Sequence, residues 1–188
     1  MTIHAGRHQL STDRGRIVLR TFREGLASQA GHDLTIEAAR WAGELTVHDG
    51  EALADLEVRI DMGALIVRDG SGGLKPLTDR DRREIGVTAR KVLAADRNPE
   101  ATFSAAGLKL IDPGDGEISG TLTLAGVTRP LQLRVSQTGP GRYRATASVA
   151  QTGFGIKPYS GFLGALKVRD AVDVEVEIDL ADLAEAPA

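Results

Sequence analysis

Alternating apolar and polar residues constrain the fold of this chain more than any other feature of its sequence. The clearest example is residues 117–135, EISGTLTLAGVTRPLQLRV, in which leucine, isoleucine and valine recur at two-residue spacing on both sides of residues 126–130. Successive side chains of a strand point to opposite faces, so this pattern predicts two half-buried antiparallel strands joined by a tight connection. The apolar face of this hairpin must cover either a packed core or a bound molecule.

The same alternation recurs along the chain. It predicts further strands at residues 16–22, 34–38, 41–47, 53–60, 101–111, 143–150 and 171–180. Turn-forming residues at 48–50 and 112–116 separate neighbouring strands. About eight to ten strands, with no internal repeat or linker, predict one all-β domain over residues 1–188: an antiparallel β-barrel of about eight strands. Closure of the barrel would leave no sheet edge exposed.

One segment, residues 79–95, departs from the β pattern. Ile85, Ala89 and Val92 recur at helical spacing, and Thr78 with Asp81 resembles a capping box. The segment therefore predicts a helix over 79–95 that ends before the Asn-Pro pair at 98–99. Its arginines and lysine fit either a helix laid on a barrel mouth or a solvated basic face. Residues 68–77, RDGSGGLKPL, predict a flexible loop before the helix.

The composition excludes several classes of protein. A net charge of −3 argues against a nucleic-acid partner, which calls for a basic face. The absence of cysteine excludes disulfides and thiolate metal sites. The first residues, MTIHAGRHQL, show no basic-then-apolar leader, and no apolar run approaches the roughly 20 residues that span a bilayer. We therefore expect a cytoplasmic protein with no transmembrane segment.

Few residues suggest catalysis or metal binding. His32 and Asp33 are adjacent and could form an acid/base pair, but neighbouring strand residues point to opposite faces and no nucleophile motif accompanies them. A structural or ligand-contacting histidine is the simpler interpretation of His32. The four histidines lack metal-ligand spacing, and the glycines at 70–73 lack the lysine and hydroxyl of a phosphate loop. No cofactor and no metal are predicted.

The aromatic residues cluster in a glycine-rich segment at 154–166, which holds Phe154, Tyr159 and Phe162. They could plug one end of a barrel, or they could form an aromatic mouth for an apolar ligand, with Lys157 available to a polar head. Both interpretations predict similar sequences, because ligand pockets are also mostly apolar. Small residues at inward positions, such as Gly120, Ala145 and Ala147, favour an interior with room for a ligand.

Several motifs together resemble the YceI-like family of polyisoprenoid-binding, lipocalin-like proteins. They occur in the order of the family and cover nearly the whole chain: GH at 31–32, WAG at 41–43, DLEVRI at 55–60, NPEATFS at 98–104, GTLTLAGVTRP at 120–130, FGI at 154–156 and the strand at 172–178. The segment at 120–130, with the preceding NPEATF, is the most specific. Residues 87–96 lack the aromatic-rich stretch usual in the family.

The resemblance implies a lipocalin-like barrel whose tunnel holds a long apolar lipid without catalysis: an isoprenoid, a polyprenyl quinone or a fatty-acyl chain, for storage or transport. The candidate ligand-binding residues are Phe22, His32, Trp41, Phe103, Leu122, Leu124, Phe154, Tyr159 and Phe162. Two alternatives stay open, an enzyme that uses His32 on a hydrophobic substrate and a structural or partner-binding barrel with a filled core. A homodimer through an open barrel end is also compatible with the pattern.

Overall fold

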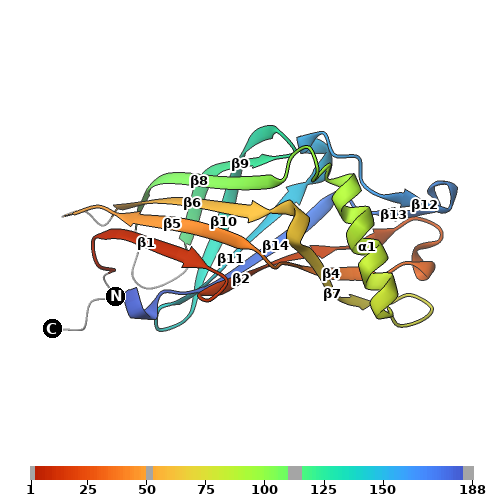
Figure 1. Ribbon diagram of the computed structural model, residues 1–188, viewed down its shortest axis with the longest axis horizontal. Helices are drawn as coiled ribbons and strands as arrows, with labels where there is room; N and C mark the ends of the chain where they lie inside the picture. Colours follow the sequence, from red (N-terminus) through yellow and green to blue (C-terminus); the bar gives the residue numbers. More distant parts are fainter. Residues whose placement is uncertain (1–2, 50–52, 110–115, 184–188) are drawn as a thin grey trace.

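The computed structural model describes residues 3–49, 53–109 and 116–183, and its fold is dominated by one antiparallel sheet (Figure 1). Among the described residues, this sheet has eleven strands in the order β1-β5-β6-β8-β9-β10-β11-β14-β2-β4-β7. In chain order their bounds are β1 Gly6–Ser11, β2 Gly15–Thr21, β4 Asp33–Ala38, β5 Trp41–Val47, β6 Leu53–Asp61, β7 Leu65–Ser71, β8 Glu100–Lys109, β9 Gly116–Leu124, β10 Val127–Gly139, β11 Arg142–Ala150 and β14 Ala171–Asp179.

A second, small sheet lies at one end of the molecule. It pairs β12 (Ser160–Gly161), β13 (Leu166–Val168) and β3 (Arg23–Glu24) in that order. Short 3-10 turns flank it, η1 at Ser28–Ala30 and η4 at Phe162–Gly164, while η2 (Met62–Ala64), η3 (Gln151–Phe154) and η5 (Ala181–Leu183) lie elsewhere. This end of the molecule is opposite the end near β1 and η5 (Figure 1).

The mostly-β, antiparallel character expected from the sequence is confirmed, but the closed eight-stranded barrel is wrong. The hydrogen-bonded ladder is a strongly curled half-barrel with two ends, β1 and β7. The cause is a break in two long segments: β4 and β5 are separated at residues 39–40, and β6 and β7 are separated by η2. Each segment therefore contributes one strand near one end of the ladder and a second strand near the other.

The expected strands are present, but the alternation did not predict β1, β7 or the three short strands of the small sheet. β7 occupies the first part of the segment expected to be a flexible loop. The hairpin connection is shorter than expected, because β9 and β10 are joined by Ala125 and Gly126 alone, both with positive φ (50° and 78°). The expected turn at 112–116 lies largely outside the described residues.

The one helix of the described residues, α1, spans Asp79–Val92 and packs beside β7 at the end of the molecule that carries β12 and β13 (Figure 1). The predicted capping box is confirmed: Asp81 N donates to Thr78 Oγ1, and Thr78 N donates to Asp81 Oδ2. The helix ends at Val92 rather than at residue 95. Ala94 takes a left-handed conformation (φ 49°), and Ala95 N donates to Arg90 O, which closes the helix with a Schellman motif.

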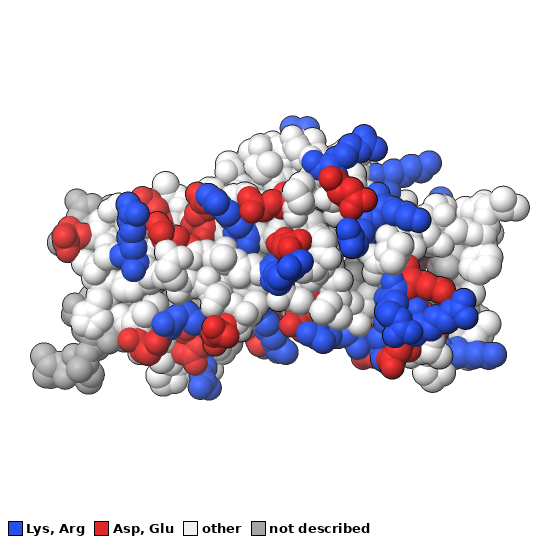
Figure 2. All heavy atoms as spheres, in the orientation of Figure 1, with Lys and Arg blue, Asp and Glu red and all other residues white. Residues whose placement is uncertain are grey.

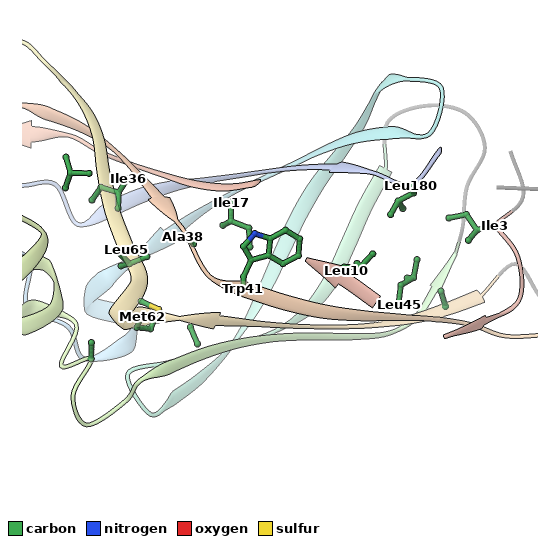
Figure 3. Packing of buried hydrophobic residues seen from close by; sticks show 14 of the residues in the cluster. Ile3, Leu10, Ile17, Ile36, Ala38, Trp41, Leu45, Met62, Leu65 and Leu180 are labelled. Atoms are coloured by element: carbon green, nitrogen blue, oxygen red, sulfur yellow. The ribbon is translucent and has the colours of Figure 1, made fainter. Parts of the chain in front are cut away.

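Buried side chains line the inner surface of the curled sheet in two clusters. Figure 3 shows the larger cluster, in which Trp41 lies between Ile36 and Leu65 on one side and Leu45 and Leu180 on the other. The smaller cluster groups Phe103, Leu122, Leu133, Val149, Phe154 and Ile156 with Ala105. The apolar faces predicted from the alternation are therefore the faces that point inward.

Glu177 ties three neighbouring strands together on the outer surface. It accepts hydrogen bonds from Arg16 on β2 (2.7 Å) and Arg144 on β11 (2.9 Å), and these bonds lower the pKa of its carboxyl. A lowered carboxyl pKa contributes stability that is present above the ordinary glutamate pKa of about 4.3 and is lost as the pH falls through the lower folded-state value.

We therefore expect Glu177→Gln to destabilise the fold at pH 7 by about 1 kcal/mol, a modest value because the three side chains are partly exposed. The difference between variant and wild type should shrink as the pH falls below about 4. Urea unfolding at pH 7 and at pH 3 measures both values. An equal difference at the two pH values would show that the charge of Glu177 does not contribute.

Candidate functional site

The inner surface of the curled sheet surrounds a cavity of about 1060 Å³. Its walls come from the inward positions of every long strand, among them Ile17, Ile36, Leu45, Val58 and Phe103. The volume lies just above the range of about 300–1,000 Å³ that is typical of small-molecule pockets. A filled core, one of the alternatives left open by the sequence, is therefore not what the structure contains.

Strand β14 shows how far the interior is hollow. Val172, Val174, Val176 and Ile178 point inward and line the cavity, yet each keeps part of its surface accessible. Residues at inward positions of a close-packed core would be fully buried. From Val172 to Leu180 the lining extends over nine residues, and the eight steps between them span roughly 27 Å at about 3.4 Å per residue. The cavity is therefore long enough for an extended chain.

The hairpin that dominates the sequence pattern contributes directly to this wall. Leu122 and Leu124 from β9, together with Leu131 and Leu133 from β10, line the cavity. Gly120, on the same inward face, does not leave free space, because the ring of Phe103 fills its position: a Cβ built there would lie 2.6 Å from Phe103 Cζ. The small inward residues thus serve two purposes, since Ala145 borders the cavity while Gly120 admits a neighbouring ring.

Three residues that line the cavity, Leu74, Tyr159 and Phe162, are also exposed to solvent, which places an opening of the cavity at their end of the molecule. Three segments form this end, here called the mouth segments: residues 22–32, 72–78 and 155–170. Their members that line the cavity include Gly31, Leu74, Pro76, Tyr159 and Leu166. Helix α1 borders the same opening through Ile85, Ala89 and Val92. All of these elements lie together at the end of the molecule that carries β12 and β13 (Figure 1).

Two side chains hold the mouth segments in place. Arg23 donates from Nη1 to Gly31 O (2.7 Å), and its guanidinium packs so closely on Gly72 that a Cβ there would lie 1.8 Å from Nη1. His32 Nε2 donates to Lys75 O (2.8 Å) and packs on Gly73, whose φ of 73° also favours glycine. Each contact joins the segment around 72–75 to the segment around 23–32. His32 therefore has a positioning role in this structure.

Charged side chains of the cavity wall gather at the mouth. Arg23, Lys75 and Lys167 belong to the mouth segments, while Asp81 and Glu84 belong to α1; among the described residues, Glu117 is the one charged lining residue elsewhere. Hydrogen bonds from Thr78 lower the pKa of Asp81, so this carboxylate stays ionised. The rest of the wall is aliphatic and aromatic apart from a few polar side chains, such as Thr21 and Gln151. An occupant would place an apolar chain deep inside and a polar group at the mouth.

Trp41 lies across the middle of the interior and lines the cavity (Figure 3). Its indole Nε1 is buried and has no hydrogen-bond partner among the described residues, and the same holds for Thr21 Oγ1, another lining residue. Buried donors are normally paired. A bound molecule with an acceptor oxygen could satisfy the indole N–H.

The structure places seven of the nine candidate ligand-binding residues on the cavity wall: His32, Trp41, Phe103, Leu122, Leu124, Tyr159 and Phe162. The other two lie elsewhere. Phe154 is buried in the smaller hydrophobic cluster, and Phe22 packs against Arg169, whose Cζ is 5.3 Å from the ring centroid. Lys157 is not a lining residue either, whereas Lys75 and Lys167 are. Residues 74–77 and helix α1 also line the cavity near the mouth, but they were not among the candidate ligand-binding residues. The apolar stripe of the helix is the sequence feature that could have indicated them.

His32 and Asp33 do not form the acid/base pair considered from the sequence. Asp33 Oδ1 accepts from Arg23 N (2.8 Å), while His32 Nε2 faces Lys75 O. No hydrogen bond joins the two side chains within the described ranges, and no cluster of three or more His, Asp or Glu residues in those ranges could hold a metal ion. In the same part of the chain, no helix has the length and apolar character to cross a membrane.

A family model for the YceI-like domain matches residues 20–180, which include nearly all of the sheet and the whole cavity mouth. The chain belongs to the YceI-like family. This confirms the resemblance drawn from the sequence motifs. No curated protein matches the chain.

Three solved structures show the same fold. BcnA from Burkholderia cenocepacia is 13% identical, with a TM-score of 0.59, and the match covers 87% of this chain and 94% of that one. A polyisoprenoid-binding domain from Saccharophagus degradans implicated in plant cell wall breakdown is 12% identical, with a TM-score of 0.57 and coverage of 94% and 99%. The YceI protein of Campylobacter jejuni is 18% identical, with a TM-score of 0.51 and coverage of 77% and 83%. At these identities the likeness concerns the fold.

Proposed function

We propose that this protein binds one long-chain apolar lipid inside the cavity, without chemical conversion, and stores or transports it. The observation that carries the proposal is the hollow interior: an elongated apolar cavity of about 1060 Å³ whose charged lining residues, apart from Glu117, gather at one end. Each methylene transferred from water to such a wall contributes about 0.8 kcal/mol. A chain of isoprene or acyl units therefore binds firmly with few hydrogen bonds.

The chemistry of the wall restricts the ligand further. Lys75 and Lys167 at the mouth favour a lipid with an acidic or strongly polar head. The Nε1 of Trp41, which has no hydrogen-bond partner in the part of the chain that the structure describes, favours a lipid with an acceptor oxygen near the middle of the cavity. Isoprenoid, polyprenyl-quinone and fatty-acyl lipids all remain within this proposal. The polyisoprenoid binding of the Saccharophagus domain supports the first two.

Trp41 is the only tryptophan of the chain, so its fluorescence reports directly on the cavity. Dibromostearate, whose bromine atoms quench indole emission on contact, should quench Trp41 in a saturable manner. Excess unbrominated stearate, a polyprenol or a quinone should reverse the quenching according to its affinity. N-acetyltryptophanamide, which has no cavity, controls for collisional quenching.

The result that would contradict the proposal is equally direct. Quenching that grows linearly with probe concentration, as with the free amide, would show that dibromostearate does not enter. If a brominated prenol also fails to quench Trp41 in a saturable manner, the cavity does not take long-chain lipids and the proposal is wrong.

A further inference from the structure

Apolar side chains protrude into solvent around the cavity mouth. Leu26 and Leu163 are fully exposed (101% and 109% relative accessibility), Leu74 is 79% exposed and Phe162 is 69% exposed. All four belong to the mouth segments, and together they are here called the apolar rim. Exposed apolar side chains that are scattered singly need no explanation, but a group around a cavity opening marks an interaction site.

Pairing of the small sheet brings two of these side chains together. In the β12–β13 hairpin, Gly161 pairs with Leu166, so residues 162–165 form its tip. The segment that carries Leu26 runs beside this tip, because Lys167 pairs with Glu24 and Ala27 N donates to Ala165 O (2.8 Å). Leu26 and Leu163 are therefore presented at the same end of the molecule, next to the opening of the cavity.

The backbone at the tip of this hairpin is strained at two residues of the apolar rim. Phe162 and Leu163 are consecutive non-glycine residues with left-handed φ values of 49° and 55°. Bulky residues rarely adopt this conformation, and such strain persists at functional sites where the surroundings enforce it. Here, the strained turn carries the fully exposed Leu163 and the largely exposed Phe162, which also borders the cavity.

Positive charge surrounds the apolar rim, although the whole chain is acidic. The mouth segments and α1 carry ten arginines and lysines against five aspartates and glutamates, a local net charge of +5, whereas the chain carries −3. Arg80, Arg82 and Arg90 form ion pairs within or next to the helix, but Lys75, Lys157 and Lys167 have none among the described residues. In Figure 2, basic side chains lie beside an uncharged surface at this end of the molecule.

We propose that the mouth docks on the surface of an anionic lipid bilayer, with the apolar rim inserted at the interface and the lysines against lipid headgroups. Apolar side chains flanked by Lys and Arg bind interfaces in this way, through buried apolar area and attraction to anionic lipids. The inference rests on the proposed function for its purpose, because a lipid cargo could then pass between bilayer and cavity without crossing water. The docking itself is inferred from the exposed apolar rim and from the positive charge of the mouth segments and α1.

Sedimentation with vesicles tests the docking. The protein should bind phosphatidylcholine vesicles that contain phosphatidylglycerol, bind pure phosphatidylcholine vesicles much less, and lose binding as salt is raised. The double variant Leu26→Ser/Leu163→Ser should bind the anionic vesicles at least about tenfold more weakly. Neither residue lines the cavity, so quenching of Trp41 by dibromostearate should be unchanged. Ile66→Ser, which removes a 41% exposed isoleucine from β7 outside the mouth, is the matched control and should bind as wild type does.

The outcomes separate the two proposals. Absence of vesicle binding, or binding that the double variant does not weaken, overturns docking even if Trp41 quenching shows that the cavity takes lipid. Vesicle binding without any quenching of Trp41 supports docking and contradicts lipid storage. Self-association that disappears in the double variant, in a protein that ignores vesicles, would assign the apolar rim to a second copy of the chain and would also overturn the proposal.

Discussion

Ala145→Trp is expected to reduce lipid affinity by roughly 100-fold while leaving the fold intact. Ala145 lies on β11, pairs with Val135 and Val176, and borders the cavity together with both. An indole ring at this position enters empty space rather than a packed core, so the melting temperature should change little. If the ring displaces three or four methylenes of the ligand at about 0.8 kcal/mol each, the loss of affinity is about two orders of magnitude.

Thr146→Trp is the matched control, because it adds the same ring on the outer, exposed face of the same strand. It should bind lipid as wild type does. Equilibrium dialysis with a radiolabelled lipid is the suitable measurement, since a second tryptophan would confuse the fluorescence of Trp41. Undiminished binding by Ala145→Trp would show that the ligand does not occupy this part of the interior, and destabilisation of Ala145→Trp alone would show that the space is not truly empty.

Strand positions could be predicted from the sequence because alternation is a local property. The segment at 171–180 alternates without interruption, and the structure turns the predicted side of it inward. β7 was missed because its sequence does not alternate: Leu65–Val67 is a short apolar run, and the polar residues Arg68 and Asp69 follow it. A strand that is apolar at one end and polar at the other gives too weak a pattern to separate it from a loop.

The curl of the sheet could not be predicted from the sequence. It depends on the breaks at residues 39–40 and at η2. Each break divides a continuous segment into two strands that pair near opposite ends of the ladder. The backbone at these breaks is joined by long-range hydrogen bonds, Ala39 N to Ala64 O and Asp61 N to Arg40 O. Pairings between residues more than 20 positions apart leave no periodic signal. The number of strands and the open ends of the ladder therefore could not be predicted from the alternation.

The choice of candidate site residues met a similar limit. Aromatic residues were chosen because they are few; of these, Trp41 and Phe103 line the cavity, whereas Phe22 and Phe154 lie elsewhere. Whether an inward residue faces free volume depends on the size of its neighbours on other strands. Gly120 and Ala145 are both small and inward, yet only the second borders the cavity.

Gly120→Val provides the strongest test of this packing. A Cβ at residue 120 would lie 2.5 Å from Ser104 O, a backbone atom of the neighbouring strand, and 2.6 Å from Phe103 Cζ. The ring of Phe103 can turn away, but the carbonyl can move only if β8 and β9 separate locally. Overpacking of this kind costs about 3 kcal/mol, so the melting temperature should fall by roughly 6 to 12 °C.

Differential scanning calorimetry measures this change, and Ser119→Val is its control because it adds the same side chain to the exposed face of β9. That control should melt within about 2 °C of wild type, since surface substitutions are usually worth no more than about 0.5 kcal/mol. Displacement of Phe103 into the cavity should also weaken lipid binding in Gly120→Val, because the ring then occupies ligand space. A normal melting temperature with normal lipid affinity would show that the contact between Gly120, Ser104 and Phe103 is looser than described.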